Sequence, residues 1–349
     1  MPKLAWLRRP GGRESGASGP VVGRISKPAA VAAILVPAGG FAVANIFYPN
    51  QQELVMMMVY LVMAQGINVI YGFTGYLPFG YAGFFGAGAY GLSLSVIYLH
   101  VPAEVGLVFA VVAAIVVAAL LSPLLRLDGV YFAIASLAAA EALYVVISNP
   151  SLTAITKGPY GINLIAVYNS NASFIAALAL VAVAMGVAVY LRSSRFGLAL
   201  RAIRNDAVSA EYAGIRVVRQ RAAAWLISAA LAGAAGGIFA WYTSTFYPEA
   251  VFDTSISIFA IVFALFGGVG TVWGPALGAV ILFGIYNTVG ISEPQYFQLI
   301  YGVLIVLLVL FLPGGLAGLA RHLVSAFNHI RGGRGQITER PVGSGTGDG

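Results

Sequence analysis

Long apolar segments recur along almost the whole chain and constrain its fold more than any other feature. The segment AEVGLVFAVVAAIVVAAL at 103–120 is typical, with one charged residue in eighteen. An α-helix needs about 20 predominantly apolar residues to cross the roughly 30 Å hydrocarbon core of a bilayer. This pattern predicts an all-α polytopic membrane protein of about ten transmembrane helices, at residues 28–48, 54–72, 78–99, 103–125, 130–148, 174–191, 222–247, 256–270, 275–291 and 296–313.

The composition agrees with this class. Only 9% of the 349 residues are charged and 60% are hydrophobic, whereas a soluble domain carries about a quarter charged residues. The net charge of +7 lies in the segments between apolar runs, as expected of residues that orient a chain in a membrane. A nucleic-acid-binding protein would need a basic face on a folded soluble surface. We therefore expect no nucleic-acid partner.

The apolar run 256–291 is too long for one straight crossing. Its middle, GGVGTVWGPALGA at 267–279, contains several glycines and Pro275, which interrupt a continuous helix. We interpret the run as two short spans joined by a tight turn, with one broken span as the alternative.

Basic residues predict the orientation, because Lys and Arg favour the cytoplasmic side of short loops. With the basic leader 1–27 inside, six crossings return the chain inside at Arg192, Arg126 also falls inside, and Lys157 falls outside. We expect a bacterial inner-membrane protein with both termini in the cytoplasm and an uncleaved first span, although the leader also allows a signal peptide. The expected parts are the disordered leader, a transmembrane domain 28–320 with a cytoplasmic loop 192–221, and a disordered tail 321–349.

Motifs for catalysis or cofactor binding are missing from the sequence. The chain has no cysteine and no G-x-x-x-x-G-K-[ST], and GAGAYG at 86–91 lies inside a predicted span, where a dinucleotide site is not expected. Its histidines, His100, His322 and His329, have no carboxylate or cysteine at ligand spacing. We expect a chain that is not an enzyme, with no metal and no cofactor of its own.

Polar residues inside the predicted spans are candidates for a translocation pathway, because such groups are costly in a membrane. They are Gln65, Asn68, Tyr76, Tyr81 and Glu141. Gln65 and Asn68 share one helix face, and hydrogen bonding to neighbouring helices is their alternative role. The two tyrosines bracket Pro78, where the third span is expected to be bent or unwound. For Glu141, a structural pairing and a pathway role are both open.

The segment RFGLALRAIRNDAVSAEYAGIRVVRQR at 195–221 stands out, because it places six arginines between apolar runs. Asp206 is suited to cap a helix N-terminus, and Gly214 suits the left-handed position after its end. Between them, Ala207, Ala210 and Glu211 form one small-residue face with a single acid. A two-turn helix is marginal alone, so we expect it to dock on a soluble partner. A basic loop that only fixes topology is the alternative.

Five further segments, together with this one, resemble the permease subunits of branched-chain amino acid ABC transporters, the LivM-type group. The similar segments are GYLPFGYAGFFGAGAY (75–90), DGVYFAIASLAAAEAL (128–143), TKGPYGI (156–162), RFGLALRAIRNDAVSAEYAGIRV (195–217), SAALAGAAGGIFAWY (228–242) and ALFGGVGTVWGPALGA (264–279). They cover roughly residues 50–315 in the expected order.

The resemblance implies several partners and a role for the arginine-rich segment. Such permeases pair with a homologous LivH-type permease, with two cytoplasmic ATPase subunits that bind ATP and Mg²⁺, and with a periplasmic or tethered binding protein. The segment would contain the coupling helix that docks on the ATPase, and Tyr212 stands where the family pattern has a small residue. The coupling residues implied are Arg201, Arg204, Asp206, Ala207, Ala210, Glu211 and Gly214.

The function implied is that of a permease of the branched-chain amino acid/ribose type in an ATP-driven importer, translocating branched-chain or other small hydrophobic amino acids by alternating access. Urea, short amides and aromatic acids are alternative substrates. The residues alone also leave open an ion-coupled secondary carrier and a structural membrane scaffold.

Overall fold

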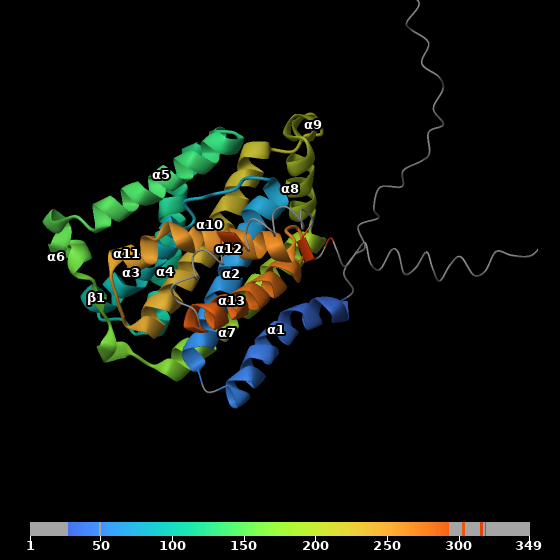
Figure 1. The fold of residues 1–349 in the computed structure, drawn as a ribbon. Helices are drawn as coiled ribbons and strands as arrows, with labels where there is room; N and C mark the ends of the chain where they lie inside the picture. Colours follow the sequence, from blue (N-terminus) through green and yellow to red (C-terminus); the bar gives the residue numbers. More distant parts are fainter. Residues whose placement is uncertain (1–26, 49, 293–301, 304–314, 317, 319–349) are drawn as a thin grey trace, which may run out of the picture.

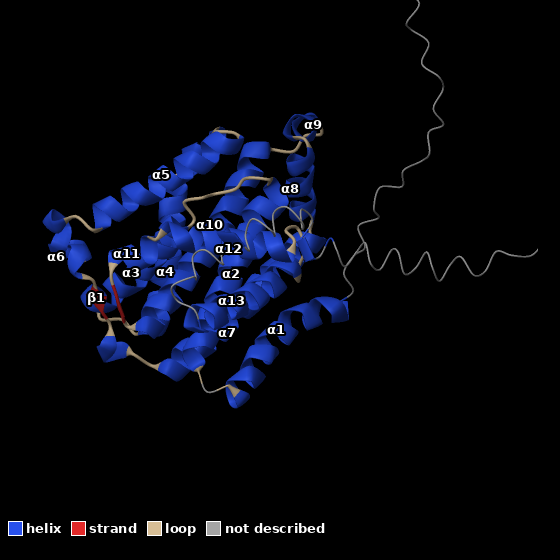
Figure 2. Ribbon diagram, viewed as in Figure 1, coloured by secondary structure: helices blue, strands red, loops and turns tan. Residues whose placement is uncertain are grey.

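The computed structural model describes residues 27–48, 50–292, 302–303, 315–316 and 318 (Figure 1). Nearly all of this part is helical, as Figure 2 shows, with one pair of two-residue strands. The all-α class is therefore confirmed. The elements in chain order are α1 (Lys27–Phe47), α2 (Gln51–Ile67), η1 (Asn68–Gly72), α3 (Ala82–Leu99), α4 (Ala103–Leu120), η2 (Ser122–Arg126), α5 (Gly129–Ile147), η3 (Pro150–Leu152), α6 (Thr153–Thr156), η4 (Gly158–Tyr160), β1 (Ile162–Asn163), η5 (Ile165–Val167), α7 (Ser170–Ser193), α8 (Arg195–Asn205), α9 (Ala207–Tyr212), α10 (Val217–Thr243), β2 (Thr245–Phe246), α11 (Pro248–Phe252), α12 (Thr254–Gly267) and α13 (Gly274–Ser292).

Helices occupy nine of the ten predicted spans. Within the described residues, eight helices are long and apolar enough to cross a membrane, counting η1 with α2 and α11 with α12. A ninth, shorter apolar helix is Gly274–Thr288 of α13. The tenth predicted span, 296–313, lies outside the described residues except for 302 and 303, and the tail and nearly all of the leader lie outside them too.

The long run 256–291 forms two helices, α12 and α13, so the predicted interruption is confirmed. The turn between them places Gly268 at φ 104° and Gly270 at φ 79°, a left-handed region that glycine enters without steric cost. The two helices also touch beside this turn. A Cβ at Gly267, the last residue of α12, would lie 1.8 Å from the carbonyl oxygen of Gly274, the first residue of α13.

Alternate connections gather at opposite ends of the helix bundle. At one end, Ser170 bonds Gln51, Tyr98 Oη donates to the Ala154 carbonyl at 2.6 Å, and β1 pairs with β2. This end holds the α1–α2, α3–α4, α5–α7 and α10–α12 connections, and we call it the outer end after the predicted orientation.

The remaining connections meet at the other end, which we call the inner end. Arg204 of α8 bonds the Gly72 carbonyl, and Tyr76 Oη donates to Asp128 at 2.7 Å. The Gly270 amide lies at this end too, where it donates to Asn68. Successive helices therefore alternate in direction, as predicted. Which end faces the cytoplasm stays a prediction.

The centre of the bundle is the contact between α3, α4 and α10, which small residues bring close together. A Cβ at Gly88 would lie 2.0 Å from the Gly233 carbonyl oxygen, and one at Gly236 would lie 1.9 Å from the Phe85 carbonyl oxygen. The sequence GAGAYG thus serves helix packing in α3. Larger side chains fill the space beside this contact, with the buried Trp225 ring 4.8 Å from that of Phe84.

Several helix boundaries differ from the predicted ones, among them the starts of the third and seventh spans and the end of the fourth. The third span starts at Ala82 rather than 78, because residues 75–81 form an unwound segment, as the flanking tyrosines and Pro78 indicated. The fourth α-helix ends at Leu120, and a 3-10 helix that contains Pro123, Ser122–Arg126, follows it. The seventh starts at Val217, five residues early, because helix-forming Arg and Gln extend α10 into the arginine-rich segment.

Two helices lie at the edge of the bundle in Figure 1. α1 packs mainly on α7. Only 11% of its most apolar 18-residue stretch is buried, against 78% for the corresponding stretch of α2 and η1. α5 is 22% buried and projects along the opposite edge. Both therefore present extensive apolar surface outward.

Candidate coupling site and translocation residues

The capped short helix predicted in the arginine-rich segment is present as α9. Asp206 Oδ1 accepts the Val208 amide at 3.0 Å and Oδ2 accepts the Ser209 hydroxyl at 2.5 Å. These bonds, above all the one from the Ser209 side chain, lower the pKa of Asp206. At the other end, Gly214 has φ 84° and its amide donates to the Glu211 carbonyl at 2.9 Å. A separate helix, α8, precedes the cap, so Arg201 and Arg204 are helical.

The small-residue face of α9 packs on its own chain. Ala210 is 4% exposed and contacts Ile203 and Val217, with Ala207 beside them. The surface that α9 offers outward consists instead of Val208, 61% exposed, Tyr212, 90% exposed, and the exposed Glu211. Sequence reasoning missed Val208, and it noted Tyr212 only as a departure from the family pattern. An exposed apolar pair flanking an acid fits a docking contact.

A cavity of about 450 Å³ lies beside α9 at the inner end. Its walls come from α9, η2 and the start of α10, and its charged lining residues are Arg126, Asp128, Glu211 and Arg221. Arg221 also stacks on Tyr76, with its guanidinium 4.4 Å from the ring centroid. Burial is the main cause that raises the pKa of Tyr76, to about 12. Tyr76 is therefore buried behind this cavity, against its lining residues Asp128 and Arg221.

The two arginines of α8 have different partners. Arg201 donates to the carbonyls of Gly197 and Arg192, at 3.3 and 3.4 Å, so it fixes the corner between α7 and α8. Partial burial, and then the charge of Arg192, lowers its pKa. Arg204 instead reaches the rest of the bundle: it bonds the Gly72 carbonyl and stacks 5.9 Å from Tyr71.

Gln65 and Asn68 hold the turn between α12 and α13. Asn68 Nδ2 donates to the Thr271 carbonyl at 2.9 Å and its Oδ1 accepts the Gly270 amide at 2.6 Å. Gln65 Nε2 donates to the Val272 carbonyl at 2.8 Å, and Gln65 Oε1 accepts from Asn68 at 3.1 Å. Both side chains are fully buried. These bonds match the predicted alternative of hydrogen bonding to neighbouring segments, and we call the two residues the amide clamp.

The clamp and Arg204 meet at η1. A Cβ at Gly72 would lie 2.3 Å from Asn68 Oδ1 and 2.8 Å from the Gly270 amide nitrogen, and one at Gly270 would lie 3.5 Å from Arg204 Nη1. The π-helical turn of η1 ends at this point, which leaves the Gly72 carbonyl available to Arg204. One connected set of contacts therefore joins α8, the end of α2 and the α12–α13 turn.

Tyr81 lies in the bundle interior, away from Tyr76. Its hydroxyl donates to the Ser228 carbonyl at 2.8 Å, and Ser228 Oγ donates to the Gly66 carbonyl at 2.7 Å. Tyr81 thus links α3 to α10 next to the amide clamp.

Glu141 lies on an exposed part of α5 beside the start of α12, where its carboxylate accepts the Thr254 hydroxyl at 3.1 Å. This bond is a pairing of the structural kind that the sequence left open for Glu141. The residue is six residues from the end of the helix, or about 9 Å at 1.5 Å per residue. A carboxylate at this depth is costly against lipid, so this face requires cover by protein or water. Within the described residues, His, Cys, Asp and Glu form no cluster that could hold a metal ion.

These features define a helical membrane protein with a short capped helix at one end of the bundle. The sequence model described as "Branched-chain amino acid transport system / permease component" matches residues 52–309, and the chain belongs to this family. As a permease component, it is a transport subunit and not an enzyme.

Curated relatives carry the same description. The chain is 30% identical to the high-affinity branched-chain amino acid transport system permease protein LivM of Salmonella typhimurium over 298 residues, covering 76% of this chain and 69% of that protein. It is 29% identical to LivM of Escherichia coli over the same shares. It is also 29% identical to LivH of Escherichia coli, over 38% of this chain and 43% of that protein. No solved structure matches significantly.

Proposed function

We propose that this chain is the permease subunit of an ATP-driven importer in the bacterial inner membrane, with both termini cytoplasmic. The observation that carries the proposal is the connected set of contacts from α8 to η1 and the α12–α13 turn. A basic loop that only fixed the orientation of the chain in the membrane would need no such contacts. In an importer, they transmit the movement of a soluble ATPase into the helices that cross the membrane.

The exposed surface of α9 contacts one ATPase subunit in this mechanism. Val208 and Tyr212 provide apolar contact area and Glu211 provides charge, while Asp206 and Gly214 keep the helix formed. ATP and Mg²⁺ are held by the partner, and this chain supplies no ligand to them. Closure of the ATPases moves α9 with α8, and Arg204 passes the movement to the end of α2.

The pathway lies along the exposed side of α5 that carries Glu141, beside a second, homologous permease. This assignment is supported by Glu141, whose exposed carboxylate is poorly suited to lipid. Similarity to both LivM and LivH proteins supports the pairing of two related chains. Alternating access then opens the space between the two permeases to each side in turn, and a binding protein delivers the substrate at the outer end.

The substrates are branched-chain or other small hydrophobic amino acids. The names of the relatives support this class, and so does a cavity of about 160 Å³ near the outer end. Aromatic side chains, among them Tyr60, Phe85 and Phe259, line this cavity together with Asp253. Such a lining suits a small molecule with an apolar part and an ammonium group. Urea, short amides and aromatic acids are the competitors to test.

The test uses the chain co-expressed with its neighbouring ATPase and permease genes. We expect Glu211→Arg to reduce co-purification of the ATPase and to abolish substrate-stimulated ATP hydrolysis and uptake in proteoliposomes. Glu104→Arg is the matched control, since Glu104 is an exposed acid at the outer end. Uptake by this chain alone, driven by an ion gradient, would show that it is a secondary carrier. Competition of labelled leucine uptake by urea and by aromatic acids decides the substrate class.

A further inference from the structure

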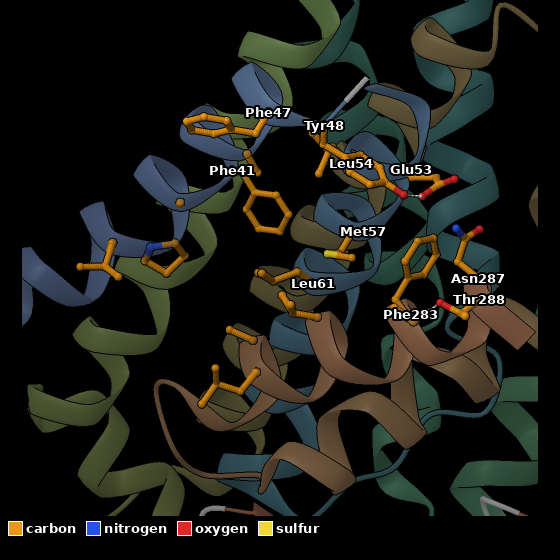
Figure 3. Close-up of a pocket in the computed structure, with 18 of the residues that line it drawn as sticks. Phe41, Phe47, Tyr48, Glu53, Leu54, Met57, Leu61, Phe283, Asn287 and Thr288 are labelled. Atoms are coloured by element: carbon orange, nitrogen blue, oxygen red, sulfur yellow. Dashed lines mark hydrogen bonds between the residues drawn. The ribbon is translucent and has the colours of Figure 1, made fainter. Parts of the chain in front are cut away.

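A groove of about 650 Å³ lies between α1, α2 and α13. In Figure 3, Phe41 of α1, Met57 of α2 and Phe283 of α13 point toward the same space. Apolar side chains line the groove along most of its length. α1 covers it from the side while exposing much of its own surface, with Phe47 81% exposed. Within the part of the chain that the structure describes, the groove therefore lies at the edge of the helix bundle.

The outer end of the groove is polar, in contrast to its walls. Tyr48 Oη and Asn50 Nδ2 each donate to a different oxygen of the Glu53 carboxylate, both at 2.5 Å, and Figure 3 shows the first of these bonds. Asn287 also interacts with this carboxylate. No Lys or Arg is among the described residues that line the groove. Glu53 therefore places an acid, held by neutral donors, where the apolar groove reaches the membrane surface.

We propose that this groove binds a membrane phospholipid whose headgroup carries a primary ammonium. A polar end joined to a long apolar wall matches an amphiphile, and the charge of Glu53 complements an ammonium that can donate hydrogen bonds. The acyl chain lies between Phe41 and Phe283, and the headgroup meets Glu53 and Asn287.

The size of the groove suits an acyl chain. The groove offers about 650 Å³, which is room for on the order of twenty groups the size of a water molecule. Helix α1 precedes the family match, which begins at residue 52. The lipid thus fills the space between α1 and the helices within the family match, α2 and α13, and its binding does not depend on which substrate is transported.

Native mass spectrometry of the purified full chain tests the proposal. Three phospholipids with identical acyl chains are added: phosphatidylethanolamine, phosphatidylcholine, which lacks ammonium hydrogens, and phosphatidylglycerol, which lacks the ammonium. We expect the ethanolamine lipid to bind about tenfold more tightly than the other two, as for one charge-assisted hydrogen-bonded contact. Glu53→Gln, which keeps the shape, should abolish this preference. Glu104→Gln, at the outer end of α4 and outside the groove, should preserve it.

A second variant tests the apolar part. A Cβ at Gly40, which lines the groove, meets nothing within 4 Å, so Gly40→Trp should fold, fill the groove and reduce binding of all three lipids. A photoreactive residue at position 40 should yield an adduct with the mass of the phospholipid in native membranes. An adduct with another polypeptide, or equal binding of the three lipids by the unaltered chain, overturns the proposal.

Discussion

Replacing Asn68 by Leu tests whether the amide clamp fixes the α12–α13 turn. The substitution keeps similar volume but removes the acceptor for the Gly270 amide and the donor to the Thr271 carbonyl, the two backbone groups of the turn, together with the donor to Gln65 Oε1 within the clamp. Each part-buried group left without its partner costs about 1–3 kcal/mol. Because the turn lies at the inner end and water reaches part of it, we expect the lower half of that range, or about 3 kcal/mol for the two groups together.

The loss of stability in Asn68→Leu should be concentrated at the α12–α13 turn. Hydrogen–deuterium exchange at the amides of 268–273 should accelerate by about a hundredfold, since 1.4 kcal/mol corresponds to a factor of ten. ATP-driven uptake should fall more than ATPase co-purification, because α9 is untouched. Asn171→Leu is the control: Asn171 is an exposed residue of α7. Unchanged exchange at 268–273 in a folded Asn68→Leu protein would refute the idea that this amide holds the turn.

Three further predictions follow from other parts of the molecule. Gly88→Ala forces a Cβ into the backbone of α10 and should destabilise the protein by about 1–3 kcal/mol in thermal unfolding, whereas Gly39→Ala, with open space around it, should not. The lowered pKa of Asp206 means that its cap stabilises α9 fully above the ordinary value of 3.8 and is lost as pH falls through the lower folded-state value; exchange at 208–212 should therefore accelerate in acid, and Asp206→Ala should remove that pH dependence. In this cysteine-free chain, Tyr212→Cys should react with membrane-impermeant thiol reagents only from the cytoplasm and Tyr160→Cys only from outside, and the reverse pattern would overturn the orientation.

Local sequence signals predicted the parts of the fold that depend on local physics. Apolar length located the spans, and the glycines with Pro275 located the break between α12 and α13, because a turn that needs positive φ selects glycine. Asp206 and Gly214 located both ends of α9 for the same kind of reason. The starts of α3 and α10 were less accurate, by four and five residues, because apolar length alone does not register unwinding near Pro78 or the helix-forming Arg and Gln that precede residue 222.

The partners of the polar residues depend on contacts between distant parts of the chain. Asn68 and Thr271 are 203 residues apart, and Arg204 and Gly72 are 132 apart, and one sequence contains no signal that pairs them. The inward direction of Ala210 was equally hidden, because a small-residue face suits its own α10 as well as a partner. The exposure of Glu141 depends on how α5 projects from the bundle, which apolar length alone does not indicate.

The close backbone contacts among α3, α4 and α10 determine which parts of the molecule are free to move. Where Gly88 meets Gly233, the two helices touch through main-chain atoms, so sliding one along the other would drive the side chains on either side into the opposing backbone. These three helices should therefore travel as one rigid body. During transport, α5 and the α12–α13 hairpin should each turn about that body as a unit, because Gly267 and Gly274 hold α12 against α13 through main-chain atoms in the same way.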